Sequence, residues 1–74
     1  SFRVYPNPTS ESIIIESKTD KNHISIYNIQ GVLLKEMYSS GFITRINITD
    51  LSPAVYFIEV SNTRDKQHQK FIIK

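Results

Sequence analysis

The side chains that could do chemistry in this sequence are two histidines, His23 and His68, and three aspartates, Asp20, Asp50 and Asp65. An imidazole beside a carboxylate can act as a general base, and several serines are available as nucleophiles. Both histidines stand at the start of a predicted strand, where an ordinary solvated histidine is the more common finding. We therefore expect no catalytic site and no enzyme activity.

Metal and cofactor chemistry is not indicated either. The histidines are 45 positions apart, the acidic residues are scattered and cysteine is absent, so no spacing typical of a zinc or calcium site occurs. Phosphate-binding loops need clustered glycines, whereas Gly31 and Gly41 are isolated and occupy predicted turns. The sequence predicts no metal and no cofactor.

Charge and hydropathy exclude two further classes of partner. The net charge of +2 is small, although residues 61–74 carry four basic and one acidic side chain, so a nucleic-acid partner is not favoured. The longest apolar run is five residues, at 54–58, far short of the roughly 20 that cross a bilayer, so no transmembrane segment is predicted. The aromatic residues are expected to pack in a core or on a sheet surface: Phe2, Tyr5, Tyr27, Tyr38, Phe42, Tyr56, Phe57 and Phe71.

Alternation of apolar and polar residues with a period of two dominates the chain, which predicts strands. We expect strands near 2–5, 12–17, 23–28, 32–38, 43–48, 55–60 and 67–73. This spacing is typical of a single all-β domain, residues 1–74, that forms a small immunoglobulin-like β-sandwich of about seven short strands in two mostly antiparallel sheets. The predicted core is Ile24, Ile26, Val32, Leu34, Ile46, Ile48, Tyr56, Ile58, Val60, Phe71 and Ile73, with Leu51 closing one end.

Two local features remain after these assignments. One is the entrance Tyr5-Pro6-Asn7-Pro8, where two prolines fix φ, remove backbone donors and exclude a helix. The other is the ending Lys70-Phe71-Ile72-Ile73-Lys74, which in a strand puts both lysines and Ile72 on one face and Phe71 and Ile73 on the other. The lysines either guard an edge strand against pairing or form a docking surface.

In order and spacing, these segments resemble the C-terminal sorting domain of proteins exported by the type IX secretion system of Bacteroidetes, from about Val4 to Lys74. The matching segments are YPNP at 5–8, ISIYNIQG at 24–31, INITDL at 46–51, AVYFI at 54–58 and the lysine-flanked last strand. The family usually has glycine where this chain has Ala54, which implies either an ordinary φ at Ala54 or local strain.

The resemblance implies that the chain is a sorting signal rather than a catalyst. It would direct an N-terminal, covalently linked passenger from the periplasm through the outer-membrane translocon, with shuttle components as further partners, to the cell surface or the extracellular space. A sortase-like cysteine endopeptidase commonly removes such a domain. Residues 1–8 would be the linker junction and first strand, and 67–74 the terminal strand. The resemblance further implies recognition through Lys70, Phe71, Ile72, Ile73 and Lys74, and mainly structural roles for Tyr5, Pro6, Asn7, Pro8, Gly31, Leu51 and Tyr56.

Two other functions stay open at this point. A carbohydrate-binding or adhesive module would expose Tyr38, Phe42 and Phe57 on one surface. An inert immunoglobulin-like spacer would continue past Lys74. Because the chain has neither an initiator methionine nor a signal peptide, we expect it to be a segment of a longer protein.

Overall fold

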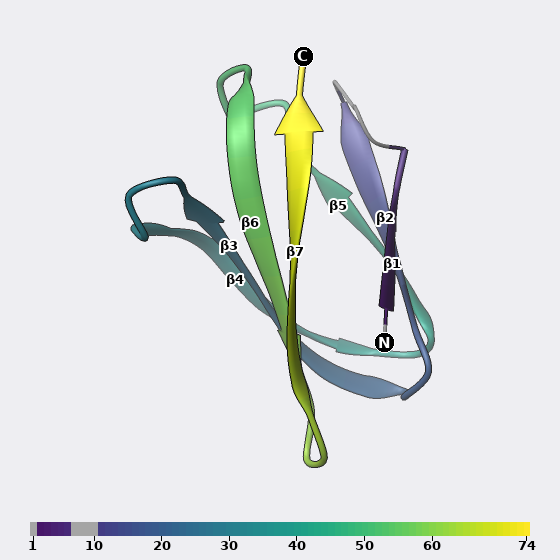
Figure 1. Cartoon of the computed structure of the whole chain (residues 1–74). Helices are drawn as coiled ribbons and strands as arrows, with labels where there is room; N and C mark the ends of the chain where they lie inside the picture. Colours follow the sequence, from purple (N-terminus) through teal and green to yellow (C-terminus); the bar gives the residue numbers. More distant parts are fainter. Residues whose placement is uncertain (1, 7–10) are drawn as a thin grey trace.

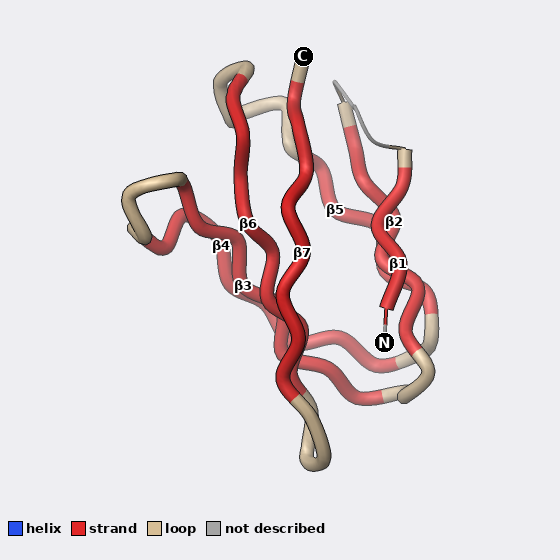
Figure 2. The backbone as a smooth tube through the Cα atoms, in the orientation of Figure 1, coloured by secondary structure: helices blue, strands red, loops and turns tan. Residues whose placement is uncertain are grey.

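The computed structural model describes residues 2–6 and 11–74, and all its regular elements within them are strands (Figures 1 and 2). The strands are β1 (Phe2–Tyr5), β2 (Ser12–Ser17), β3 (Lys21–Asn28), β4 (Leu33–Ser40), β5 (Ile43–Asn47), β6 (Ala54–Ser61) and β7 (Lys66–Ile73). No helix capable of spanning a membrane is found in these residues. The predicted all-β fold is confirmed.

The strands form two sheets, one with the order β1-β2-β5 and the other with the order β4-β3-β6-β7. Every pairing between neighbours is antiparallel. Two tight hairpins, β3–β4 and β6–β7, make up the four-stranded sheet, and the two sheets pack face to face as predicted for a sandwich.

The core lies between the sheets because alternate side chains of each strand point inward. It consists of Phe2, Val4, Ile13, Ile15, Ile24, Ile26, Ile46, Ile48, Tyr56, Ile58, Val60, Phe71 and Ile73, with Met37 and Leu51 packed against it. Nine of the predicted core residues are therefore confirmed, and Leu51 lies at the margin as expected. The three-stranded sheet adds four core residues to the predicted set: Phe2 and Val4 from β1, and Ile13 and Ile15 from β2.

The prediction was wrong for Val32 and Leu34, which are 51% and 40% exposed. Val32 lies in the turn before β4 rather than in the strand. The register between β3 and β4 shifts at Ile26/Tyr27, so that Ile26 faces Lys35 while Tyr27 faces Leu33. One extra residue on β4 interrupts the alternation, as a β-bulge does, and Leu34 is not carried into the core.

The first and last strands lie side by side. β1 is an edge of the three-stranded sheet, β7 is an edge of the four-stranded sheet, and the two strands contact each other. Both strands run in the same direction (Figure 1). The beginning of β1 and the end of β7 consequently lie at opposite ends of a molecule whose longest extent is 31 Å.

One ion pair ties the loop after β5 to the four-stranded sheet, and its removal is a test of the local electrostatics. Nζ of Lys35 lies 2.9 Å from Oδ2 of Asp50, and this hydrogen bond lowers the pKa of the Asp50 carboxyl. A carboxyl with a depressed pKa stabilises the fold above its unfolded pKa, and that contribution is lost as pH falls through the lowered value.

We expect Lys35→Met to raise the pKa of Asp50 toward its usual range in an NMR titration. An unchanged pKa would contradict this account.

Candidate functional site

Strand β7 has the two faces that its sequence predicts. Phe71 and Ile73 are 0% and 4% exposed, whereas Lys70 and Lys74 are exposed and Ile72 is 40% exposed. Because β7 is the edge strand next to β6, the two lysines and Ile72 stand on the outer face of the four-stranded sheet, at its border. The structure therefore places four of the five predicted residues on β7 and Lys74 directly after it, with their side chains on two faces.

The inward side chains anchor this strand. The Phe71 ring stacks on the ring of Tyr56 from β6, with centroids 5.7 Å apart. The hydroxyl of Tyr56 donates a hydrogen bond of 2.6 Å to the carbonyl of Ser52 in the preceding loop. Leu51, from the same loop, is half-buried against the core. Tyr56 thus contacts β7 through Phe71 and the preceding loop through Ser52, while Leu51 packs against the core.

Part of the entrance segment falls within the described residues. Tyr5 ends β1 half-buried, the guanidinium of Arg3 lies 5.4 Å from the centre of its ring, and the exposed Pro6 follows. The expectations for Asn7 and Pro8 lie outside the described residues. Tyr5 is the last residue of β1 and pairs with Ile14 of β2, so Pro6 follows the first strand of the sandwich.

Gly31 is needed for the backbone of the β3–β4 turn. Its φ is +85°, although the space around it is open to a Cβ. The side-chain oxygen of Asn28 accepts hydrogen bonds from the backbone amides of Gln30 and Val32, at 2.9 and 3.0 Å, and thereby fixes the turn.

Replacement of this glycine has a defined expected result. We expect Gly31→Ala to lower the free energy of unfolding by about 1–2 kcal/mol, because an L side chain is strained at positive φ. Urea denaturation would measure the loss. The matched control is Ala54→Gly: Ala54 occupies the family's usual glycine position but has no positive φ, so the glycine offers no relief there. A gain in stability from Ala54→Gly would show that the backbone at Ala54 is strained and that its φ is not an ordinary one.

Both histidines pair with glutamates rather than with the aspartates that we considered. Nε2 of His23 lies 2.6 Å from Oε2 of Glu36, and Nε2 of His68 lies 2.9 Å from Oε1 of Glu59. Each histidine is the third residue of its strand, and its partner stands on the neighbouring strand. Sequence reasoning missed these partners because strand pairing decides them.

The four side chains do not assemble a reaction centre. All lie on the outer face of the four-stranded sheet, and the described residues contain no group of three side chains suited to a metal ion. Imidazole–carboxylate pairs spread over an open sheet face have no enclosed space in which a substrate could be held and desolvated.

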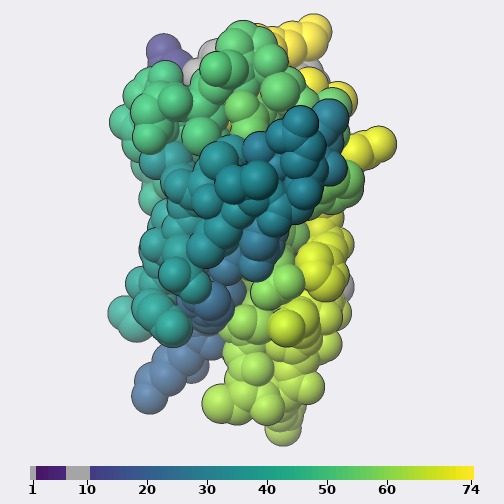
Figure 3. Space-filling view, turned by 90° about the vertical axis from the view of Figure 1, so that its left-hand side faces the viewer, coloured from purple at the N-terminus to yellow at the C-terminus, as the bar shows by residue number. Residues whose placement is uncertain are grey.

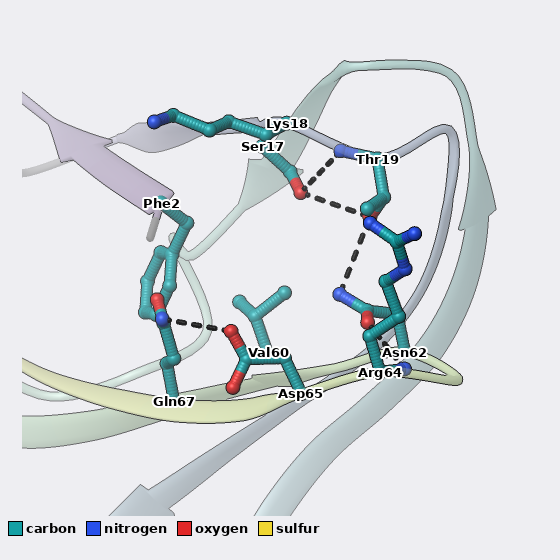
Figure 4. A pocket seen from close by; sticks show the side chains of 9 residues that line it. All are labelled: Phe2, Ser17, Lys18, Thr19, Val60, Asn62, Arg64, Asp65 and Gln67. Carbon is teal, nitrogen blue, oxygen red and sulfur yellow. Dashed lines mark hydrogen bonds between the residues drawn. The ribbon is translucent and has the colours of Figure 1, made fainter.

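A small pocket of about 180 Å³ opens at the end of the sandwich where β1 begins (Figure 4). Its lining residues are Phe2, Ser17, Lys18, Thr19, Val60, Asn62, Arg64, Asp65 and Gln67. The polar side chains in it bond mainly to one another: Thr19 Oγ1 accepts from Asn62, and Asp65 accepts from Gln67 at 3.0 Å. These hydrogen bonds hold together the loops at this end of the sandwich.

The three aromatic residues of the carbohydrate-binding alternative are exposed but do not share one surface. Tyr38 and Phe57 stand on the outer face of the four-stranded sheet, opposite His23 and Tyr27 of β3. His23 and Tyr27 are four residues apart on β3, so Tyr38 and Phe57 stand in rows about 13 Å apart. Phe42 lies beyond them in the turn to β5 and lines a pocket with residues of the other sheet. A planar platform for sugar rings is therefore not formed.

Three further residues share the outer face with Lys70: Tyr27, which was expected in the core or on a sheet surface, and Leu33 and Val55, which sequence analysis assigned to neither face. The register places Leu33 and Phe57 on either side of Tyr27, and Val55 opposite Ile72. A signal was present in β6, which is apolar on both faces, because Val55 and Phe57 alternate with the core residues of the same strand. Figure 3 views the molecule from the side of this sheet, with the β3–β4 hairpin across the centre.

The fold defines a class of protein: a small antiparallel β-sandwich domain whose terminal strand carries lysines on its outer face. The sequence profile described as "Secretion system C-terminal sorting domain" matches residues 3–74. The chain belongs to this family, which consists of type IX sorting signals rather than catalysts. The expected resemblance is thereby confirmed.

Two similar proteins place the domain in context. An endo-acting ulvan lyase of Formosa agariphila is 34% identical over 97% of this chain, which covers 14% of the lyase. A solved structure of PorZ, described as an essential bacterial surface component of the type IX secretion system of Porphyromonas gingivalis, superposes with a TM-score of 0.83 at 20% identity. The match covers the whole of this chain and 11% of PorZ, and at that identity it confirms the sandwich fold alone. The chain thus spans a small part of both proteins.

Proposed function

We propose that this chain is the C-terminal sorting domain of a secreted protein and directs a passenger, joined ahead of residue 1, across the outer membrane through the type IX system. The observation that carries the proposal is the family match over residues 3–74. The passenger passes through the periplasm and reaches the cell surface or the extracellular space. The lyase relative supports an enzyme as passenger, since the matched segment is a minor part of that protein.

In the proposed pathway the domain acts first as a sorting signal and then as the substrate of a peptidase. Shuttle components and the outer-membrane translocon recognise it, and a sortase-like cysteine endopeptidase removes it and attaches the passenger to the surface. Residues 1–8 comprise the junction with the passenger and the first strand of the sandwich. Pro6 leaves β1 without a backbone donor at that position, which supports a defined end to the sheet there.

We assign recognition to the outward side chains of the terminal strand, Lys70, Ile72 and Lys74. Support comes from the burial of Phe71 and Ile73, which fixes the direction of the other three. For neither lysine does the structure give an ion-pair partner among the described residues. Two cations at a sheet border are then available to carboxylates of a receptor.

The export of a reporter tests the proposal. A fluorescent reporter fused ahead of residues 1–74 is expressed in a host with a working type IX system and compared with the same fusion lacking residues 67–74. We expect surface display or release of the first and periplasmic retention of the second. Equal retention of both fusions would overturn the proposed function.

Charge reversal tests the assigned residues. We expect Lys70→Glu/Lys74→Glu to reduce export of the fusion by about tenfold or more, because like charges across an interface are strongly disfavoured. The matched control is Lys18→Glu/Arg45→Glu, which makes the same charge change at two exposed positions elsewhere in the fold. Normal export of the terminal-strand variant, with an intact thermal unfolding transition, would show that the two lysines are not needed for recognition.

A further inference from the structure

An apolar band crosses the outer face of the four-stranded sheet from one edge to the other. It consists of Tyr27, Leu33, Val55, Phe57 and Ile72. Leu33 of β4 faces Tyr27 of β3, Tyr27 faces Phe57 of β6, and Val55 of β6 faces Ile72 of β7. Each of the four strands therefore contributes at least one member.

The exposure of the band is large for side chains standing on a sheet. Leu33 is 44%, Phe57 39% and Ile72 40% exposed, and the remaining two members are half-buried. Strands about 4.8 Å apart give the band a width of about 14 Å across the sheet. The outer face of an antiparallel sheet is usually polar, and a continuous apolar stretch on it marks an interaction site.

Two lysines lie beside the band, and two carboxylates lie one row away from it. Lys70 stands directly opposite Phe57, and Lys74 follows Ile72 on the same face. The carboxylates of Glu36 and Glu59, one row further along the sheet, are each held by a histidine. The band is thus bordered by cations without a carboxylate partner in the described structure, and the neighbouring anions are already occupied.

We propose that the apolar band and Lys70 together form the docking surface for a protein of the export apparatus that presents apolar side chains next to carboxylates. This inference rests on the proposed function and extends its recognition site from one strand to the whole sheet face. Charge complementarity selects this occupant. If a second copy stacked its band on the first, Lys70 of each copy would approach the lysines of the other, and these like charges would repel each other.

The shape of the band also favours a protein over a lipid surface. Three of its five side chains are only about two-fifths exposed. Insertion into a bilayer interface requires an apolar face that can sink about 5–10 Å, whereas a complementary protein face can pack against a flat apolar surface.

The test uses the reporter fusion with two pairs of substitutions. Leu33→Thr/Phe57→Thr removes apolar surface from the band, and threonine retains a high strand propensity. The matched control is Phe42→Thr/Ile43→Thr, which removes two side chains that are 56% and 61% exposed away from the band. We expect the band variant to lose about tenfold in export, since truncated interface anchors commonly cost that much in affinity, and the control to export normally. Thermal unfolding of both purified domains checks that each is folded.

The outcomes separate the inference from the proposed function. Normal export of the folded band variant, alongside failure of the fusion lacking 67–74, overturns the band and leaves the sorting function standing. No export of the unaltered fusion overturns both. Purified domain is also sedimented with vesicles of phosphatidylglycerol and phosphatidylcholine and examined by analytical ultracentrifugation. Vesicle binding or dimerisation that disappears in Leu33→Thr/Phe57→Thr would replace the protein partner with a lipid or a second copy. Neither is expected.

Discussion

Replacement of Phe71 by alanine is expected to bring the domain to the limit of its stability. The ring is fully buried and stacks on Tyr56, and removal of such a side chain typically costs about 3–5 kcal/mol. A chain of this length has a total free energy of unfolding of roughly 4–11 kcal/mol. We therefore expect Phe71→Ala to be largely unfolded at 37 °C and at most weakly exported. Circular dichroism during heating and urea denaturation would measure the loss.

Phe57→Ala is the matched control for this change. Phe57 pairs with Lys70 on the neighbouring strand, but its side chain stands on the outer face and is 39% exposed. Because less apolar surface returns to water and no cavity forms, we expect a loss below about 1.5 kcal/mol. Equal destabilisation by the two substitutions would show that β7 is not anchored through its inward face.

Replacement of Asn22 is expected to have the second largest effect. Asn22 is 5% exposed. Its side-chain oxygen accepts hydrogen bonds from the hydroxyls of Ser17 and Thr19, and its amide donates to the carbonyl of Thr19, at 3.1, 2.8 and 3.0 Å. Asn22→Ala leaves these partners unsatisfied where water has little access, so we expect a loss of about 2–3 kcal/mol in the free energy of unfolding by urea.

Asn47 provides the comparison that isolates burial. Its side-chain oxygen likewise accepts two hydrogen bonds, from the amide and the hydroxyl of Thr49, at 2.9 and 2.7 Å, but Asn47 is exposed. Water can replace the lost partner there, and we expect Asn47→Ala to cost less than about 1 kcal/mol. A similar cost at both positions would contradict the role of burial at Asn22.

The terminal strand shows what the sequence alone could predict. The alternation in KFIIK assigned Phe71 and Ile73 to the core and the lysines to the outside, because in a strand side-chain direction follows from sequence position. The same rule assigned Ile24, Ile58 and Val60 correctly. Where a strand continues without interruption, a period of two is sufficient to divide its faces.

The rule failed where pairing between strands intervened. Leu34 alternates with Val32 in the sequence, yet the bulge opposite Ile26/Tyr27 adds one residue to β4 and changes which side chains face inward. Glu36 and Glu59 were not foreseen as histidine partners for a related reason, since each lies beside its histidine only through the pairing of two strands, β3 with β4 and β6 with β7. The apolar band has the same origin, because it is assembled across strands and no local stretch of sequence contains it.

The placement of the two terminal strands has a mechanical consequence. Strands β1 and β7 contact each other and run in the same direction, so the points where they begin and end lie at opposite ends of the sandwich. A pull applied through Phe2 and opposed at Lys74 would act along the strands, and the hydrogen bonds of each ladder would share the force instead of breaking one after another. We expect a domain loaded in shear in this way to resist mechanical unfolding better than one whose edge strand is peeled away one hydrogen bond at a time.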